Sequence, residues 1–291
     1  MEKNVCHQDV PLKKYNSWKV GGPAQFFYIC SDKDLLSEHI KIKKISPPFT
    51  FIGLGSNMLI RDGGIKGTVI MMHGGLSEVS IYGQYFYADA GVSCSKAAKF
   101  IAKEGFSHSA FLAGIPGTIG GALAMNAGCY GSETWNFVKK VLVIDGQGNQ
   151  CERDKEEYVP EYRKVKNKNN LNEYFLGAWL QFPQGVKEDA EKDIKFLLKS
   201  RKESQPLDWP TAGSTFRNPP NHFAAKLIEE SGLKGFTIGG AQISIKHANF
   251  IINLGNATAR DIEDLITHTI KKVFKEKNII LETEIKIIGE Y

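Results

Sequence analysis

Residues 114–122 read Gly-Ile-Pro-Gly-Thr-Ile-Gly-Gly-Ala, and Met125-Asn126-Ala127-Gly128 follows closely. Glycines at this density weaken ordinary helices and strands, so we expect an irregular segment whose backbone closely approaches another backbone or a ligand. A second stretch, Gly53-Leu54-Gly55-Ser56-Asn57-Met58, directly follows an expected strand at 50–52. Its glycines suit a phosphate cradle and a tight structural turn equally. Two such segments in one α/β region favour a dinucleotide whose pyrophosphate lies between them.

Neither stretch matches a standard nucleotide-binding motif. The third glycine of a Rossmann fingerprint would fall on Met58, and we expect no βαβ unit after it. A Walker A loop would require Gly-Lys-Ser or Gly-Lys-Thr, which does not follow. A dinucleotide site here is therefore neither of the Rossmann nor of the P-loop type.

Composition excludes several classes of protein. The chain has 291 residues, which suggests about two domains, and 42% hydrophobic with 24% charged residues excludes wholesale disorder. The net charge of +5 suits a phosphorylated substrate and a nucleic acid alike. Five scattered cysteines and seven dispersed histidines support neither disulfides nor a metal site. Residues 107–132 are almost uncharged, but their glycines and proline argue against a membrane span.

Hydrophobic patterning predicts alternating strands and helices before a boundary at 183–185. We expect strands at 26–30, 50–52, 68–72, 85–89, 141–145 and 174–182, and helices at 31–45 and 96–103. Residues 145–149 predict a hairpin turn, and the basic stretch 164–170 predicts a solvated loop. Beyond the boundary we expect helices around 194–198 and 224–228 and after Thr258, with strands at 250–253 and 279–288.

Two polar positions near the C-terminus have an ordinary structural explanation. Ser214 lies in a turn bounded by glycine and proline, where a hydrogen-bonding serine is the default, and no G-x-S-x-G surrounds it. Alternation along 281–287 places Glu282, Glu284 and Lys286 on one face of a strand, which by default is solvated. From the residues alone, neither position is assigned a catalytic role.

A series of blocks along the chain resembles the UDP-N-acetylenolpyruvoylglucosamine reductase (MurB) family. In chain order, the blocks are Asn16-Ser17-Trp18-Lys19-Val20-Gly21-Gly22-Pro23-Ala24, Gly53 to Asn57, Gly114 to Ala122, Glu161-Tyr162-Arg163, Gly213-Ser214-Thr215-Phe216-Arg217-Asn218-Pro219, His247-Ala248-Asn249-Phe250-Ile251-Ile252-Asn253 and Leu281 to Gly289. All of them occur in order and at matching spacing. The resemblance therefore extends over almost the whole chain.

This resemblance implies an α+β protein. The FAD-binding fold would be of the vanillyl-alcohol-oxidase type, with two α/β subdomains that divide near 70–80 and together span residues 1–185. A C-terminal α+β domain for substrate binding would occupy 186–291. The family is cytoplasmic and makes peptidoglycan precursors, so we expect no nucleic-acid or membrane partner, and a monomer.

The resemblance also assigns residues to the site. Those implied to bind FAD are Gly53, Leu54, Gly55, Ser56, Asn57, Met58, Gly91, Gly114, Pro116, Gly117, Thr118, Gly120, Gly121, Ala122 and Asn126. The catalytic arginine, serine and glutamate fall on Arg163, Ser214 and Glu284, and the substrate-binding positions on Tyr162, Asn218 and His247. No metal is implied.

The implied chemistry explains these residue types. NADPH reduces FAD, and hydride then adds to the enolpyruvyl ether of a UDP-sugar, so negative charge develops on the carboxylate side. Arg163 would stabilise that charge through a bidentate contact. Ser214 would donate a proton to the α carbon, aided by its neighbours. Glu284 would orient the substrate or, if protonated, donate a hydrogen bond.

Two details bear on the subtype and the local geometry. The span between Arg163 and Ser214 is short, so the chain resembles the members that lack a tyrosine-bearing lid insertion. The family often has a serine two residues after the arginine, whereas Val165 stands there.

Two other functions remain in competition with the reductase. One is a sugar or alcohol oxidase built on the same flavin fold, although the blocks around Ser214 and Glu284 argue against it. The other is a non-catalytic nucleotide or RNA binder, which would normally show interleaved basic and aromatic residues.

Overall fold

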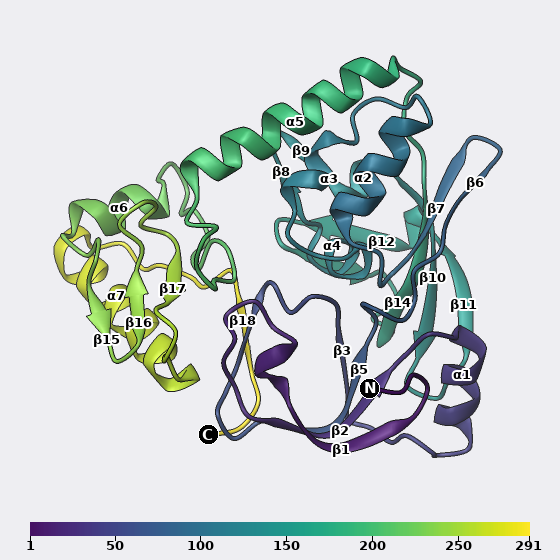
Figure 1. Ribbon diagram of the computed structural model, residues 1–291, viewed down its shortest axis with the longest axis horizontal. Coiled ribbons are helices and arrows are strands. Elements are labelled where there is room, and N and C mark those ends of the chain that lie inside the picture. Colours follow the sequence, from purple (N-terminus) through teal and green to yellow (C-terminus); the bar gives the residue numbers. More distant parts are fainter. The chain divides into compact units, whose positions relative to one another are not determined.

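The computed structural model describes residues 1–291 (Figure 1). It divides into two structural units, each built from three separate segments of the chain. Unit 1 comprises residues 1–8, 26–54 and 67–200, and unit 2 comprises 9–25, 55–66 and 201–291. The sequence predicts two consecutive domains that meet near residue 185. Instead, two early segments of the chain belong to the second unit, and the last crossing follows residue 200.

A five-stranded antiparallel sheet forms the centre of unit 1. Its order is β11-β10-β14-β7-β6, with bounds β6 Val79–Tyr82, β7 Tyr85–Asp89, β10 Val138–Asp145, β11 Gln150–Asp154 and β14 Glu173–Leu180. Helices α2 (Cys94–Lys103), α3 (Ala110–Gly114) and α4 (Ile119–Met125) cover one face (Figure 1). Val141 and Val143 point into this helix-covered core, while Ile144 packs on the opposite side. The side-chain period of two along a strand explains this division.

The opposite face of the sheet packs against a second layer. This layer contains α1 (Lys33–Lys41) and a sheet of order β1-β2-β5-β3, with β1 Cys6–Pro11, β2 Pro23–Ile29, β3 Phe49–Ile52 and β5 Ile65–Met71. Leu176 of β14 meets Tyr28, Leu36 and Ile70 there. Unit 1 is therefore a layered α+β structure with two hydrophobic cores.

Unit 2 packs two helices on a small sheet. Its sheet has the order β15-β16-β17, with β15 Thr237–Ile238, β16 Ala241–Ile243 and β17 Ile251–Asn253, and its helices are α6 (Ala224–Glu230) and α7 (Ala259–Lys277). A parallel pair joins β4 (Met58–Ile60) to β18 (Lys286–Ile288). Trp18, Phe216 and Leu265 are among the residues of its core.

The remaining elements are short, apart from α5. They are the 3-10 helices η1 (Leu12–Lys14), η2 (Thr134–Asn136) and η3 (Lys155–Glu157), the strand pair β8 (Gly128–Cys129) and β9 (Ser132–Glu133), the hairpin of β12 (Tyr158–Glu161) and β13 (Lys164–Asn167), and α5 (Lys187–Ser204). Between Arg163 and Ser214 the chain thus forms β13, β14 and α5.

Several expectations from the sequence are wrong in detail. The glycine-rich stretch after residue 114 contains helix α4, which includes Gly120 and Gly121. Residues 164–167 form β13 rather than a loop, and only Lys286–Ile288 of the expected strand 279–288 pairs as a strand. The expected helix 31–45 is shorter in the structure, because α1 covers only Lys33–Lys41. In each case non-local contacts outweigh local propensity.

Other local signals are confirmed. Thr258 and Asp261 form the capping box of α7, and Asp145 closes the hairpin turn by accepting hydrogen bonds from the backbone N–H groups of Gln147 and Asn149, both at 2.8 Å. Both signals rest on side chain–backbone bonds within four residues, which sequence patterns capture well.

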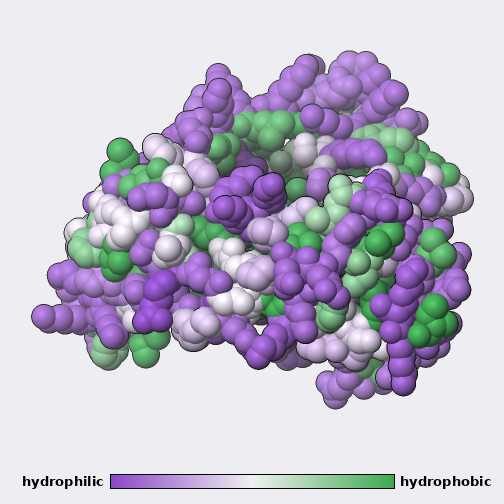
Figure 2. Space-filling model, turned by 60° about the horizontal axis from the view of Figure 1, so that its bottom comes forward, coloured by the Kyte–Doolittle hydropathy of each residue, from purple (hydrophilic) through white to green (hydrophobic).

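The surface in one view is largely polar. Figure 2 shows hydrophilic atoms over most of that face, with hydrophobic atoms in small separate groups. No helix combines the length and the apolar composition needed to cross a lipid bilayer.

Candidate functional site

The two glycine-rich segments meet inside unit 1. A Cβ added to Gly53 would collide with the side chain of Thr118, so the end of β3 lies directly against the start of α4. Thr118 is the N-cap of α4, and its hydroxyl accepts a hydrogen bond from the backbone N–H of Gly121 at 3.4 Å. The turn after β7 joins the same place, because the backbone N–H of Gly120 donates to Ala90 O at 2.9 Å. Gly53 and Thr118 thus lie in direct contact, and the pyrophosphate expected between the two segments stays a prediction.

Protein packing accounts for several of the glycines. An added Cβ at Gly120 would lie 2.8 Å from Ala90 Cβ, and at Gly91 it would collide with the carbonyl oxygen of Met72. Gly55 has φ +61°, and its Cβ would lie 2.5 Å from Tyr15 O within unit 2. These glycines are required by the fold itself, whatever the protein binds.

Gly121 differs, because nothing in the protein requires it. It is exposed, it has helical backbone angles within α4, and an added Cβ would meet only Thr118 Oγ1, at 3.7 Å. Alanine would favour the helix by about 1 kcal/mol over glycine there. The absence of a side chain at Gly121 leaves the backbone of the first turn of α4 accessible, so the residues present fit a bound dinucleotide.

The other residues implied to bind FAD occupy varied positions. Leu54 and Ser56 lie in the loop between β3 and β4, and Met58 begins β4. Asn57 donates from Nδ2 to Glu284 O at 3.3 Å. Around α4, Gly114 ends α3 against Cys129 Sγ, Pro116 and Gly117 link α3 to α4, and Ala122 is buried in the core.

Asn126 ends α4 in the left-handed conformation, at φ 40°. It is buried, and both ends of its side-chain amide have partners in the protein. Nδ2 donates to Glu161 O at 3.4 Å, and Oδ1 accepts from the backbone N–H of Trp135 at 3.2 Å. Asn126 thus connects α4 to the end of β12.

Arg163 lies at the tip of the β12–β13 hairpin. Glu161 and Lys164 are paired, which leaves Tyr162 and Arg163 as a two-residue link. Arg163 has φ +56°, a conformation that is uncommon without glycine and often marks functional positions. Its Nη2 donates to Gly128 O at 3.3 Å, and its guanidinium carbon is 5.0 Å from the centre of the Tyr162 ring. The arginine is therefore held beside the glycine-rich segment.

Ser214 and Glu284 lie on neighbouring extended segments of unit 2. Ser214 forms a bridge with Phe250, and the backbone N–H of Glu284 donates to Thr215 O at 2.8 Å. Ser214 and Glu284 therefore lie on adjacent segments of unit 2, while Arg163 belongs to unit 1. The Thr215 hydroxyl, between the two, is fully buried and has no hydrogen-bond partner.

The remaining predicted substrate residues also lie in unit 2. Asn218 is exposed, and its Oδ1 accepts a hydrogen bond from the backbone N–H of Ala224, the first residue of α6, at 3.0 Å. His247 is half-buried, with Nδ1 accepting from the backbone N–H of Asn249 at 3.3 Å. Burial lowers the pKa of His247, which favours the neutral imidazole at pH 7.

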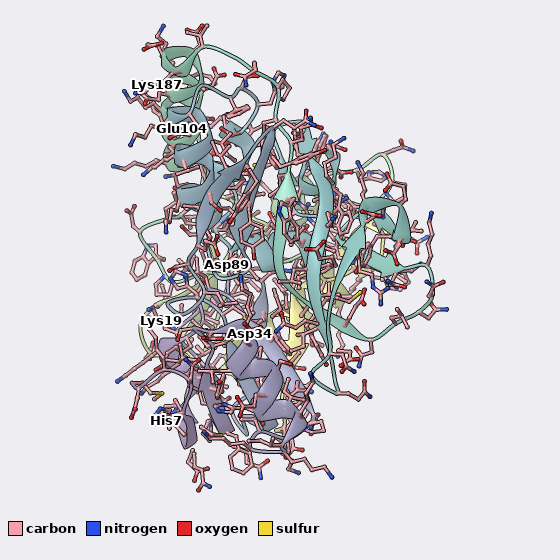
Figure 3. All side chains as sticks on the ribbon, turned by 90° about the vertical axis from the view of Figure 1, so that its right-hand side faces the viewer. His7, Lys19, Asp34, Asp89, Glu104 and Lys187 are labelled. Atoms are coloured by element: carbon pink, nitrogen blue, oxygen red, sulfur yellow. The ribbon has the colours of Figure 1, made fainter.

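A buried charge network in unit 1 was missed by the sequence analysis. Lys33 Nζ donates to Asp89 Oδ1 at 2.8 Å and to Tyr87 Oη at 2.9 Å, and Figure 3 labels Asp89 among the strands of the interior. Burial lowers the pKa of Lys33, but these hydrogen bonds outweigh that effect and raise its pKa above the ordinary value. The ammonium group therefore stays charged and joins α1 to β7.

The role of the motif around Trp18 was also not assigned from the sequence. The indole of Trp18 donates to Ile251 O at 2.8 Å, and Asn253 Nδ2 donates to Trp18 O at 2.8 Å. The motif therefore fastens an early segment of the chain onto β17. A tryptophan followed by Gly21 and Gly22 gave a local signal, but its partner lies more than 200 residues later.

Comparisons with known proteins extend over nearly the full chain. Residues 205–288 match the family model of the UDP-N-acetylenolpyruvoylglucosamine reductase C-terminal domain, and residues 24–153 match that of an FAD binding domain. A curated UDP-N-acetylenolpyruvoylglucosamine reductase of Thiobacillus denitrificans is 45% identical over 294 residues, covering 96% of this chain and 91% of the relative. The one from Methylococcus capsulatus is 46% identical over 281 residues, covering 96% and 92%.

Structural similarity agrees with the sequence matches. The crystal structure of UDP-N-acetylenolpyruvylglucosamine reductase from Thermus caldophilus superimposes with a TM-score of 0.82 at 32% identity, covering 96% of this chain and 98% of that one. The two chains therefore share one fold along almost their whole length.

Proposed function

The chain belongs to the UDP-N-acetylenolpyruvoylglucosamine reductase family, and on that premise we propose that it uses NADPH to reduce the enolpyruvyl ether of UDP-N-acetylglucosamine to UDP-N-acetylmuramate. This reaction supplies a precursor of peptidoglycan. The proposal includes a monomeric enzyme working in the cytoplasm, where NADPH and nucleotide sugars are available, without nucleic-acid or membrane partners.

One observation within unit 1 carries the proposal. The hairpin that bears Arg163 is attached to the glycine-rich segment through the bonds from Asn126 Nδ2 to Glu161 O and from Arg163 Nη2 to Gly128 O. A cation is thereby held next to the segment proposed to line the flavin. That is where a reduction that builds up negative charge would need it.

FAD, when bound, would supply the hydride that adds to the double bond of the substrate. We propose that the backbone of the Gly53–Asn57 loop holds the pyrophosphate of this cofactor and that Gly114 to Ala122 line the flavin. Gly121 supports this assignment, because its missing side chain leaves the surface of α4 open.

Arg163 would stabilise the charge that develops on the substrate carboxylate. Its planar guanidinium can make two parallel hydrogen bonds to a carboxylate, which lysine cannot match. The left-handed backbone at φ +56° supports a functional position, since this strain is stored where the surrounding structure enforces it. Tyr162, which is exposed beside it, would contact the same substrate.

Ser214 would donate the proton that the α carbon requires after hydride addition. Glu284 would orient the substrate, and Asn218 and His247 would contribute to the same pocket. The backbone bond from Glu284 N to Thr215 O supports a shared role, because it keeps Ser214 and Glu284 in fixed register.

Absorption spectroscopy of the purified protein tests this function. We expect flavin bands that disappear when NADPH is added without oxygen and return when the enolpyruvyl sugar nucleotide follows. Loss of the bands when a simple sugar or alcohol is added, and no return of the bands with the enolpyruvyl substrate after NADPH, would contradict the proposal. Colourless protein that binds no added FAD would also contradict it.

A further inference from the structure

A buried carboxylate in unit 1 collects hydrogen bonds from three separate segments. Glu173 is the first residue of β14, and its side chain is only 6% exposed. Its Oε1 accepts from the Tyr158 hydroxyl and from Asn167 Nδ2, the latter at 2.9 Å. Its Oε2 accepts from Arg153 Nε at 3.2 Å. Both oxygens of the carboxylate are therefore used, and the charge is paired.

Two of these donors form the base of the hairpin that carries Arg163. Tyr158 and Asn167 are the cross-strand pair furthest from the tip, so both strands are held by the same carboxylate oxygen. The hairpin forms a two-stranded sheet of its own. An isolated two-stranded hairpin is marginally stable, so its orientation depends on such external attachments.

The base of the hairpin is also connected to the five-stranded sheet and to α4. Glu173 pairs with Asp145 at the end of the β10–β14 ladder, between two inner strands of the five-stranded sheet. The ring of Tyr158 packs against Trp135 with centroids 4.9 Å apart, and Trp135 donates from its indole to Leu123 O of α4 at 2.8 Å. The hairpin base is thus joined to both the sheet and α4. The last pair before Arg163, Glu161 with Lys164, lies three residues along the strands from that base, a distance of about 10 Å.

We propose that Glu173 is a positioning residue for Arg163: by holding Tyr158 and Asn167 together, it fixes the hairpin that presents the guanidinium. This inference rests on the proposed function for the role of Arg163. Glu173 itself contacts neither substrate nor cofactor. It acts because a shift of the hairpin base moves the tip, and a displacement of about 1 Å at a catalytic group can reduce a rate 100-fold.

The first test is Glu173→Gln, which keeps the shape of the side chain but removes its charge. Hydrogen exchange measured on the full-length, FAD-loaded protein should become about tenfold faster at the amides of residues 158–167, since a lost hydrogen bond lowers protection by about that factor. Glu152→Gln is the matched control. Glu152 pairs with Lys140 at 2.8 Å on the exposed part of the same sheet, and its loss should leave exchange in the hairpin unchanged.

The second test separates the two half-reactions. Glu173→Gln should slow re-oxidation by the enolpyruvyl substrate about tenfold or more, with kcat and kcat/KM falling together, while reduction by NADPH stays within about twofold. Adding Glu173→Gln to Arg163→Lys should cause little further slowing, since both act on one group, whereas its effect should multiply with that of Glu284→Gln. Tyr158→Phe removes a single donor and should give a smaller effect of the same kind if Glu173→Gln fails to fold.

Several results would overturn the inference. If Glu173→Gln left hydrogen exchange in the hairpin unchanged, or slowed both half-reactions equally, Glu173 would be a general structural residue. If the double variant slowed re-oxidation by the product of the factors found for Glu173→Gln and Arg163→Lys alone, the two residues would act independently. Failure of the proposed function is distinguishable, because Arg163→Lys would then leave re-oxidation unaffected while the exchange measurement still reports on the hairpin.

Discussion

The backbone N–H of Glu284 donates a hydrogen bond to the carbonyl oxygen of Thr215 at 2.8 Å. This bond joins two segments almost 70 residues apart in the chain and holds Ser214 next to the segment of Glu284. The segments of two residues that have ordinary structural explanations in the sequence are thereby placed side by side. The predictions below start from this arrangement.

Ser214→Ala should separate the two half-reactions. The variant should bind FAD and lose its flavin absorption with NADPH at the normal rate, because the serine is needed only after hydride transfer. Re-oxidation by the enolpyruvyl substrate should be slower by about 10² to 10⁴, the range for loss of a general acid. Ser214→Cys should recover part of this rate, as stopped-flow absorbance would measure. Rapid re-oxidation of Ser214→Ala would return the residue to a structural role.

Arg163→Lys and Glu284→Gln should slow the same half-reaction as Ser214→Ala. Removing one contact to developing negative charge typically costs about 10² to 10³ in rate, and lysine cannot replace the two parallel hydrogen bonds of a guanidinium. Flavin reduction by NADPH should remain comparatively fast. If the variants instead lose only affinity for NADPH, these residues belong to nicotinamide binding.

Gly121→Ala should make the flavin-free protein more stable and weaken FAD binding. The free energy of unfolding should rise by up to about 1 kcal/mol, because alanine is the better helix former. The added methyl group should weaken FAD binding about 10- to 100-fold, since overpacking typically costs about 1–3 kcal/mol. Denaturant unfolding and FAD titration measure the two effects. Gly146→Ala, in a turn where an added Cβ meets nothing within 4 Å, should leave FAD affinity unchanged.

Thr215→Val should stabilise the protein. The buried Thr215 hydroxyl has no partner, and an unsatisfied buried polar group typically costs about 1–3 kcal/mol, so an isosteric apolar side chain should raise the free energy of unfolding by about 1 kcal/mol or more. Thr118→Val has the opposite expectation, because it removes the N-cap of α4 and should cost about 1 kcal/mol. A loss of stability in Thr215→Val would mean that its hydroxyl has a partner after all.

Glu263 should make stability depend on pH in the acid range. Hydrogen bonds from Arg61 hold the pKa of Glu263 below its ordinary value of 4.5, although burial opposes them. A depressed pKa adds stability above the pKa of the unfolded chain, and this contribution is lost as the pH falls through the lower folded value. Glu263→Gln should therefore lower the thermal unfolding midpoint at pH 7, and the difference should shrink below about pH 4.5. The exposed Glu104, labelled at the surface in Figure 3, offers a control in Glu104→Gln, whose small effect should not follow this pH profile.

Local sequence signals predicted five of the seven α-helices but fewer than half of the strands. The capping box of Thr258 with Asp261 and the turn at 145–149 each depend on bonds within a few residues, so the local sequence is enough to predict them. The expected strand at 85–89 is β7 with the same bounds. These predictions depend on no distant partner.

The glycine-rich region shows where such reasoning fails. Its composition argued against a helix, yet α4 forms because Thr118 caps it and Ile119 and Leu123 are buried in the core. Likewise, the alternating lysines of 164–167 suggested a loop, but Asn167 pairs with Tyr158 and bonds to Glu173. Tertiary contacts supplied free energy that no local pattern contains.

The sequence by itself determined the family, the candidate residues and the segments that suit a dinucleotide, because these depend on residue types in a set order. Only the tertiary structure decided what each residue touches. It separated Gly55 and Gly120, which the fold requires, from Gly121, which the fold does not. It also showed that each unit is built from separate segments of the chain. At the base of the hairpin that carries Arg163, it joined Tyr158 and Asn167 to Glu173, because hydrogen bonds between separate segments exist only once the chain has folded.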